Sequence, residues 1–242
     1  MNELSGLLDR FDRIVIFDTE TSGLDFIGDQ IIELAAICLM RNERGKAAIV
    51  DEMDEFVRLP EGRVLSDTIV QLTGITDEML LEQGISERAA ADRFLRLIGT
   101  GRTLLCAHNA QFDLMFTRRL LRGVRFEIQP QFLDTLTVYK DRRPYPHRLK
   151  DAIEAYGLSG KVQNSHRAID DVRALLEVLI AMDMERTDLE QYINLFGFNP
   201  KYGISGDKIR GVHYLPQAFH DRKTVVEQTL YAYYRACPGA EV

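Results

Sequence analysis

An uninterrupted apolar run near the start of the chain predicts a strand that is covered on both faces. Residues 14–17 read Ile-Val-Ile-Phe, and a Thr-Ser-Gly turn follows at residues 21–23. Apolar runs without polar alternation are typical of central strands. Residues 29–40 and 47–59 are predicted as further strands, with the turn sequence Asn-Glu-Arg-Gly between them. Their order along the chain predicts a three-stranded antiparallel meander.

Helical patterns dominate the following part of the chain, interrupted by an apolar run at residues 103–107 that predicts another strand. This strand leads directly into a helix that ends near Gly123. Strands followed by an alternation of strand and helix indicate an α/β domain with a mixed sheet. Ser86, and either Thr76 or Asp77, are the expected N-cap residues of two helices. The other predicted helices span residues 65–72, 77–81, 86–98, 134–140, 148–156 and 168–184.

The composition changes after about Arg186, where aromatic residues and glycines become frequent. Aromatic residues at this density are unlike a disordered tail, so we expect a domain at residues 1–186 and an ordered appendage of unknown role at residues 187–242. Residues 191–196 faintly resemble a peptide that binds a sliding clamp, although buried packing is the favoured interpretation. The tyrosines in this part are Tyr192, Tyr202, Tyr214, Tyr231, Tyr233 and Tyr234.

The overall composition favours an ordinary globular protein. Hydrophobic residues make up 45% of the 242 residues and charged residues 28%, as in soluble domains. The first residues lack a basic start followed by an apolar core, and no apolar run approaches the ~20 residues of a membrane span. The three cysteines are far apart and form no C-x-x-C pair. We therefore expect reduced thiols, a cytoplasmic location and no zinc site.

The charge distribution narrows the possible contacts with nucleic acid. A net charge of −7 argues against a protein that coats nucleic acid with a general basic surface. Positive side chains nevertheless gather at residues 118–125 and 140–150. A solvated helix face is the favoured interpretation of each stretch, and phosphate contact is the alternative.

Two acids follow the first apolar run directly. Asp18 and Glu20 are two positions apart, and this spacing places both carboxylates on one face of an extended strand. Two carboxylates at such a distance need a cation between them, or else one of them stays protonated. A divalent metal that prefers oxygen ligands meets this need. The alternative is a pair of solvated acids at a frayed strand end.

Two more acids and a histidine occur at later boundaries of predicted elements. Asp113 lies in the first turn of the helix after the strand at residues 103–107, where it either interacts with the helix N-terminus or joins a site at the strand ends. In the last predicted helix, Asp171 lies at the edge of an apolar stripe at ~100° per residue, whereas Asp170 points nearly opposite. His166 is five positions before Asp171. Carboxylates with a nearby histidine are the groups that two-metal phosphoryl chemistry requires.

Four motifs together resemble those of the DEDDh 3′ to 5′ exonucleases, typified by the epsilon proofreading subunit of bacterial DNA polymerase III. Each motif is weak alone, but their order and separation are specific, and the resemblance spans about residues 13–185. The motifs are F-D-T-E-T-S-G at residues 17–23, L-T-G-I-T at 72–76, H-N-A-Q-F-D at 108–113 and H-R-A-I-D-D at 166–171.

The resemblance implies a ribonuclease H-like fold, with a mixed five-stranded sheet flanked by helices, followed here by a small aromatic-rich C-terminal appendage. It implies two divalent ions, Mg²⁺ or Mn²⁺, held by Asp18, Glu20, Asp113 and Asp171, with His166 as the general base. It further implies contacts with the terminal nucleotides, and core packing is the alternative for two of the contact residues, Leu24 and Phe112. The implied contact residues are Thr21, Gly23, Leu24, Gly74, Ile75, Asn109 and Phe112.

The implied activity is removal of nucleoside 5′-monophosphates from single-stranded or mismatched DNA 3′ ends, in proofreading or repair. An exonuclease that trims RNA is the alternative, because these motifs do not separate DNA from RNA. A binding module without catalysis is disfavoured, because all five acid and histidine positions are filled. A DNA polymerase or a sliding clamp is a possible partner, and no membrane contact is expected.

Overall fold

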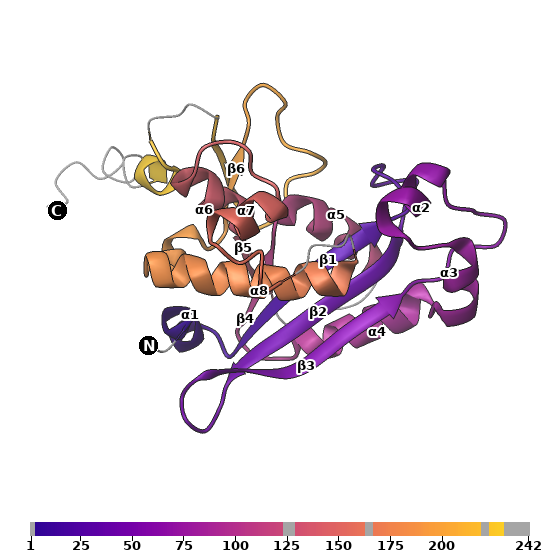
Figure 1. Ribbon diagram of the computed structural model, residues 1–242, viewed down its shortest axis with the longest axis horizontal. Helices are drawn as coiled ribbons and strands as arrows, with labels where there is room; N and C mark the ends of the chain where they lie inside the picture. The colour runs from indigo at the N-terminus through magenta and orange to yellow at the C-terminus, as the bar shows by residue number, and fades with distance from the viewer. Residues whose placement is uncertain (1–2, 123–128, 163–166, 219–222, 230–242) are drawn as a thin grey trace, which may run out of the picture.

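The computed structural model describes residues 3–122, 129–162, 167–218 and 223–229, and its centre is a mixed five-stranded sheet (Figure 1). The strand order is β3-β2-β1-β4-β5. β2 pairs antiparallel with both β1 and β3, while β1, β4 and β5 run parallel. The predicted meander is therefore confirmed. The strands are β1 (Arg13–Thr21), β2 (Ile31–Arg41), β3 (Ala47–Phe56), β4 (Thr103–Ala107) and β5 (Gln131–Asp134).

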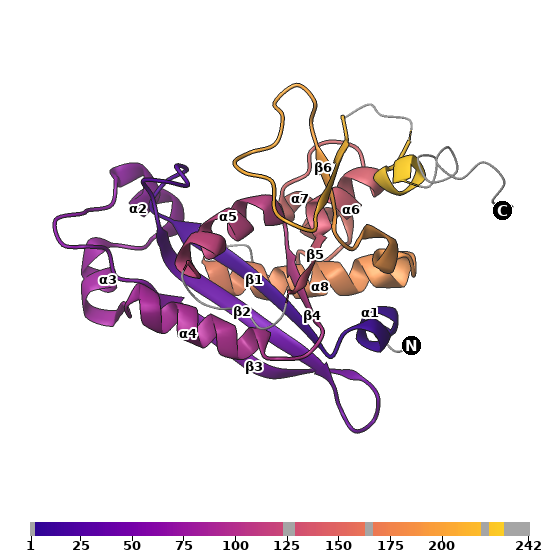
Figure 2. The same ribbon diagram turned by 180° about the vertical axis from the view of Figure 1, so that it is seen from behind.

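Helices cover both faces of the sheet, as Figures 1 and 2 show from opposite sides. One face packs against α1, α6, α7 and α8, and the other packs against α4 and α5. Two short helices, α2 and α3, precede α4. The helices are α1 (Ser5–Arg10), α2 (Asp67–Thr73), α3 (Asp77–Gln83), α4 (Glu87–Ile98), α5 (Ala110–Leu120), α6 (Thr135–Arg142), α7 (Leu149–Ala155) and α8 (Ala168–Glu185).

Alternation along β1 explains the apolar run from which the strand was predicted. Ile14 and Ile16 point into the core under α8, whereas Val15 and Phe17 point into the core under α4 and α5. Both faces of the strand are thus covered, and no polar position is tolerated before residue 18. The next residues continue the alternation, so Asp18 and Glu20 are directed toward the α8 side.

Helix boundaries follow local capping chemistry. The side chains of Ser66, Thr76 and Ser86 accept hydrogen bonds from the first turns of α2, α3 and α4, which satisfies backbone donors that would otherwise lack partners. α5 ends at Leu120, before the predicted end near Gly123. The pattern analysis did not single out α1 or β5, because each contributes only a few residues to the core.

The segment after α8 packs against the edge of the sheet. It forms a 3₁₀ turn, η1 (Leu189–Tyr192), and a small parallel sheet of β6 (Leu195–Phe198) and β7 (His213–Pro216). The backbone N–H of Asn194 donates to the carbonyl of Phe132 at 2.7 Å, and its side-chain oxygen accepts from the Phe132 N–H at 2.8 Å. Asn194 thereby occupies the free edge of β5, which an unpaired strand would leave open.

Burial of the side chains at residues 191–196 distinguishes a clamp-binding peptide from a segment packed in the core. Tyr192, Leu195 and Phe196 are at most 5% exposed, so their side chains are not available to a sliding clamp. The packing interpretation is confirmed. Tyr231, Tyr233 and Tyr234 lie outside the described residues, and the domain boundary at residue 186 stays a prediction.

The basic stretch at residues 140–150 contains two arginines with a structural role, which is neither a solvated helix face nor a phosphate contact. The Arg142 side chain is fully buried, donates to the carbonyl of Met182 at 2.7 Å, and forms ion pairs with Glu185 and Asp188. Arg143 also pairs with Glu185 at 2.7 Å. These contacts attach α6 to the end of α8. No helix within the described ranges is long and apolar enough to cross a bilayer.

Candidate active site

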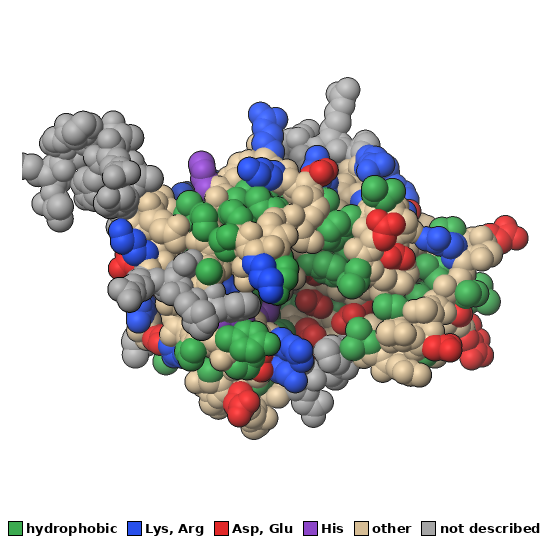
Figure 3. Space-filling view, turned by 90° about the horizontal axis from the view of Figure 1, so that it is seen from above, with side chains coloured by type: hydrophobic (Ala, Val, Ile, Leu, Met, Phe, Trp, Pro, Cys, Tyr) green, Lys and Arg blue, Asp and Glu red, His purple; other side chains and the backbone are tan. Residues whose placement is uncertain are grey.

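Three carboxylates converge where β1 meets the first turn of α8. Ligand oxygens of Asp18, Glu20 and Asp171 all lie within 4.8 Å of one another. Two of these residues come from β1 and the third from a helix about 150 residues further along the chain. In the space-filling view, acidic side chains form the floor of a hollow (Figure 3). This cluster remains open to solvent on one side.

Asp113 approaches the same strand from the opposite face of the sheet. Thr19, which alternates with Asp18 and Glu20, donates from its backbone N–H and from its hydroxyl to one Asp113 carboxylate oxygen, at 3.1 and 2.8 Å. These bonds fix the Asp113 carboxylate beside β1. Asp113 lies outside the group of three within 4.8 Å, but it is close enough to repel Asp18 electrostatically.

Among the described residues, positive charge compensates the acids of the site only in part, because the Arg167 guanidinium lowers the pKa of Glu20 but does not offset burial and repulsion. Burial, together with repulsion from Asp113 and Asp171, raises the pKa of Asp18 well above its usual range. Burial and repulsion from Asp171 raise the pKa of Glu20 to about 8, and burial raises the pKa of Asp113 to about 7. An all-oxygen, negatively charged donor set of this kind fits a hard divalent cation such as Mg²⁺ or Mn²⁺.

The two neighbouring acids of α8 have different environments. Asp171 is buried and belongs to the carboxylate cluster, whereas Asp170 is only partly buried and lies outside it. The difference follows from the helical repeat, since Val172 and Leu175 place the same face of α8 against the sheet. Asp171 is therefore the acid that the helix directs inward.

A buried ion pair that the sequence analysis did not identify holds the start of α8. Glu33 of β2 lies directly opposite Glu20 and is fully buried. One of its carboxylate oxygens accepts two hydrogen bonds from the Arg167 guanidinium, at 2.7 and 2.9 Å, and the other accepts from the backbone N–H of Ala168 at 2.9 Å. Glu33 thus ties the first turn of α8, and with it Asp171, to the strand beside Glu20. An acid inside an otherwise apolar strand was the available signal.

A second residue that the sequence analysis missed, Asp134, organises the start of α5. One Asp134 carboxylate oxygen accepts from the backbone N–H groups of Asn109 and Ala110, at 2.9 and 3.1 Å, and also from Leu136 at 3.1 Å. Asn109 has a left-handed backbone with φ 72°, and these bonds hold it there. Asp134 therefore connects the end of β5 to the end of β4, where Asn109 lies.

The predicted contact residues of the first motif follow Glu20 directly along the chain. The Thr21 hydroxyl donates to the Gly23 carbonyl at 2.7 Å. Gly23 packs so closely on the Asp29 carboxylate that a Cβ atom would lie 2.2 Å from an oxygen, so a larger residue there would displace the Asp29 side chain. Leu24 is 78% exposed, which contradicts core packing for this side chain.

The other predicted contact residues have mixed environments. Gly74 takes a left-handed backbone that ends α2, and Ile75 after it is fully buried. Phe112 is partly buried and packs its ring against Phe26 and Phe116, as core packing predicts, although its edge remains accessible. His108 bonds to Thr135 and to the carbonyl of His147 and has a structural role. His166 lies outside the described residues.

The raised carboxyl pKa values predict how stability depends on pH. The pKa values of Glu20 and Asp113 in the folded chain lie above their ordinary values of 4.5 and 3.8. The folded chain therefore binds protons more tightly than the unfolded chain does. This contribution stabilises the fold at low pH and is lost as the pH rises toward 7 to 8. A bound divalent cation offsets the repulsion between the ionised groups. We expect the increase in Tm on adding Mg²⁺ or Mn²⁺ to grow between pH 5 and 8, measured by differential scanning fluorimetry against EDTA. An increase that is the same at all pH values would contradict this assignment, and Glu20→Gln should reduce the pH dependence.

Comparison with known proteins agrees with this geometry. The sequence profile of the family described as Exonuclease, of the RNase T type, matches residues 15–179. The chain is 36% identical over 175 residues to the PolC-type DNA polymerase III of Bacillus subtilis and 32% identical over 168 residues to that of Clostridium perfringens. Each match covers 69% of this chain, but the chain spans only 11% of each relative.

Solved structures show the same fold. The zinc-bound complex of Escherichia coli exonuclease I with single-stranded DNA superposes with a TM-score of 0.63 at 22% identity, over 75% of this chain and 42% of that protein. Exonuclease I of Methylocaldum szegediense gives 0.60 at 21% identity, over 73% and 41%. The fold is thus the ribonuclease H-like fold of these exonucleases, as predicted. The chain belongs to the DEDD-type 3′ to 5′ exonuclease family.

Proposed function

We propose that this chain removes nucleoside 5′-monophosphates one at a time from the 3′ end of single-stranded or mismatched DNA, using two divalent ions. The observation that carries the proposal is the convergence of Asp18, Glu20 and Asp171 within 4.8 Å, with Asp113 held beside them by Thr19. Carboxylates at such a distance, two of which keep a raised pKa although Arg167 lies nearby, are suited to hold ions rather than a neutral substrate.

The four acids are proposed as the ligands of the ions. When bound, a pair of Mg²⁺ or Mn²⁺ ions would polarise the scissile phosphate and neutralise the charge that develops on it. The chain itself holds the four carboxylates in place. β1 holds Asp18 and Glu20 on one side, the Glu33 contact holds Asp171, and the Thr19 contacts hold Asp113. These contacts form a frame that spans both faces of the sheet, and the frame would hold the acids in position to bind the ions beside the scissile phosphate.

His166 is proposed as the general base that takes the proton of the attacking water. It directly precedes Arg167, the residue that Glu33 anchors, and a histidine has the pKa suited to proton transfer near neutral pH. His166→Ala is expected to slow turnover by roughly 10² to 10⁴ at pH 7, measured by single-turnover digestion. A rate equal to that of the unaltered protein would assign the base to another group.

The residues around the hollow are proposed to hold the terminal nucleotides. Leu24 is exposed at its edge, and an exposed apolar side chain can pack on the last base. Thr21, Gly23, Gly74 and Asn109 offer backbone and side-chain contacts, and the partly exposed ring of Phe112 can stack on a base. Ile75 is fully buried, so its proposed contribution is to hold the turn that presents Gly74. These roles rest on the resemblance of the motifs and on the placement of the residues beside the acids.

DNA is favoured over RNA because the relatives are DNA polymerases and because exonuclease I was solved with single-stranded DNA. A role in proofreading or repair, with a DNA polymerase as partner, is the corresponding biological proposal. It predicts that a mismatched duplex end is digested faster than a paired end. The active-site motifs themselves are compatible with an enzyme that trims RNA.

One digestion experiment tests activity, direction and substrate together. We expect Mg²⁺- or Mn²⁺-dependent shortening of single-stranded DNA, with mononucleotides as products and a slower reaction on paired duplex and on short RNA. The 5′-labelled strand should give a ladder, and Asp18→Ala should give none while keeping the circular dichroism spectrum of the unaltered protein. Preferential RNA digestion would establish the alternative, and unaffected digestion by Asp18→Ala would remove this site from the reaction.

A further inference from the structure

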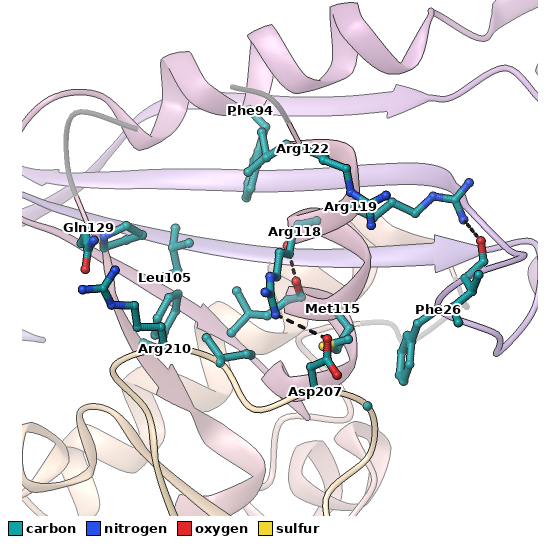
Figure 4. Close-up of a pocket in the computed structure, with 18 of the residues that line it drawn as sticks. Phe26, Phe94, Leu105, Met115, Arg118, Arg119, Arg122, Gln129, Asp207 and Arg210 are labelled. Carbon is teal, nitrogen blue, oxygen red and sulfur yellow. Dashed lines mark hydrogen bonds and ion pairs between the residues drawn. The ribbon is translucent and has the colours of Figure 1, made fainter. Parts of the chain in front are cut away.

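A cavity of about 760 Å³ lies on the α4 and α5 side of the sheet, whereas Asp18 and Glu20 point to the α8 side. Arg118 is five residues after Asp113, which places it roughly 140° around the helix axis. The cavity is bounded by α5, by the loop that carries Phe26, and by residues 206–210 of the segment after α8 (Figure 4). A ligand in this cavity would therefore not contact the Asp18 cluster.

The interior of the cavity is apolar. Its walls include Phe94 of α4, Leu105 of β4 and Leu114 of α5, all of which belong to the core under this face of the sheet. Phe132 and Ile209 add further apolar surface. The hydroxyl of Thr117 donates to the backbone carbonyl of Asp113 at 2.9 Å, so its proton is unavailable to a ligand. A cavity of this size and lining fits an apolar or aromatic group.

Positive charge surrounds this apolar interior. Arg118 of α5, Arg122 of the turn after α5 and Arg210 of the loop after β6 extend along the cavity (Figure 4), and they outnumber the two acids of the lining, Asp25 and Asp207. Arg118 is 60% exposed and lies 3.9 Å from Asp207, a distance at which an exposed pair contributes little. Within the described ranges, the guanidinium groups of Arg122 and Arg210 have no hydrogen-bond or ion-pair partner. This charge is local, since the chain as a whole carries −7.

The apolar walls and the arginines at the rim together indicate which kind of anionic ligand the cavity can bind. A nucleobase carries several polar edge groups, and burying such groups without hydrogen-bond partners is unfavourable. The deep walls supply few partners for them. An aliphatic or aromatic side chain has no such requirement, and neighbouring carboxylates would reach the arginines at the rim. Apolar anchors with charged flanks are also the usual way in which a short peptide binds a protein surface.

We propose that this cavity is a docking site for a short acidic segment of a partner protein, with one aromatic or aliphatic side chain packed against the partly exposed Met115, Phe132 and Ile209. Its carboxylates pair with Arg118, Arg122 and Arg210. Arg118 and Arg122 of the first basic stretch thus gain a role other than the two expected from the sequence. The proposal is independent of the nuclease reaction, because the cavity lies on the α4 and α5 side of the sheet and the Asp18 cluster lies on the α8 side.

The test uses the full chain and a fluorescein-labelled peptide with one phenylalanine flanked by aspartates and glutamates, both ends blocked. We expect fluorescence anisotropy to show saturable binding that weakens with salt. The double variant Arg118→Glu/Arg210→Glu should weaken binding at least about tenfold, while Arg44→Glu in the exposed β2–β3 turn should leave it unchanged. A peptide with serine in place of the phenylalanine should bind at least about tenfold more weakly.

Nuclease assays on the same variants separate the two kinds of partner. Binding that does not depend on the phenylalanine, or that survives Arg118→Glu/Arg210→Glu, would overturn the docking site. A rise in KM for single-stranded DNA in the double variant, with displacement of the peptide by an oligonucleotide, would assign these arginines to nucleic acid instead and would also overturn it. Unchanged digestion together with lost peptide binding supports the proposal.

Discussion

Asp171→Asn is expected to lower the rate of DNA digestion by about 10³-fold or more, whereas Asp170→Asn is expected to leave it within about twofold. Several kcal/mol of transition-state stabilisation depend on a properly held divalent ion, and each 1.36 kcal/mol corresponds to a tenfold change in rate. Asp171 contributes an oxygen to the cluster of three carboxylates, and its neighbour does not. The two substitutions remove the same charge from adjacent positions of one helix.

Comparing the two variants separates the effect of where the carboxylate lies from the effect of removing one negative charge. Single-turnover digestion of a labelled oligonucleotide, measured across a series of Mn²⁺ concentrations, gives both the rate and the metal requirement. Asp171→Asn should not recover at high Mn²⁺, and its Tm should rise less on metal addition than that of Asp170→Asn. Equal losses in both variants would mean that the acids act through the overall field of the helix N-terminus, and the two-ion site would then be wrong.

Glu33→Gln is expected to destabilise the protein by about 3 kcal/mol, because it removes one partner of a buried ion pair and leaves the Arg167 guanidinium without its carboxylate. The Glu33 side chain is fully buried and the Arg167 side chain is 34% exposed, which places the loss at the lower end of the range for buried pairs. The backbone N–H of Ala168 also loses its charged acceptor. Glu52→Gln provides the matched control, since the Glu52–Arg173 pair is exposed at 38% and 54% and should cost at most about 1 kcal/mol.

Urea denaturation measures the free energy of unfolding for both variants, and digestion measures the consequence for the site. Because Glu33 holds the first turn of α8, its loss should raise the Mn²⁺ concentration needed for half-maximal activity, at temperatures where the variant is fully folded. Glu52→Gln should not. A variant of Glu33 that is destabilised but has an unchanged metal requirement would show that the contact serves the fold alone.

The sequence predicted most of the elements that build the sheet and the acids that meet on it. The meander, β4 and the long helix α8 were predictable because each has a strong apolar period over its own length. Ser66, Thr76 and Ser86 begin their helices through bonds to residues three positions away, and the latter two were expected as caps. Asp171 was separable from Asp170 for the same reason, since a helix fixes the direction of each side chain relative to its neighbours.

Long-range contacts were decided only by the folded chain. The pairing of Glu33 with Arg167 joins residues 134 positions apart, and that of Asn194 with Phe132 joins residues 62 apart. Neither has a periodic signature, because the partners belong to different elements. The arginines of α5 were visible as a basic stretch, but the apolar cavity beside them is built from six separate segments of the chain.

The sequence by itself determined which groups are available and which way each element directs them, because strand alternation and the helical repeat are local properties of the backbone. The tertiary structure alone decided that Asp18, Glu20 and Asp171 share one hollow, that Asp113 reaches the same strand from the other face, and that Glu33 holds α8 in place. Those distances follow from how the helices pack on the sheet, and packing depends on all the elements together.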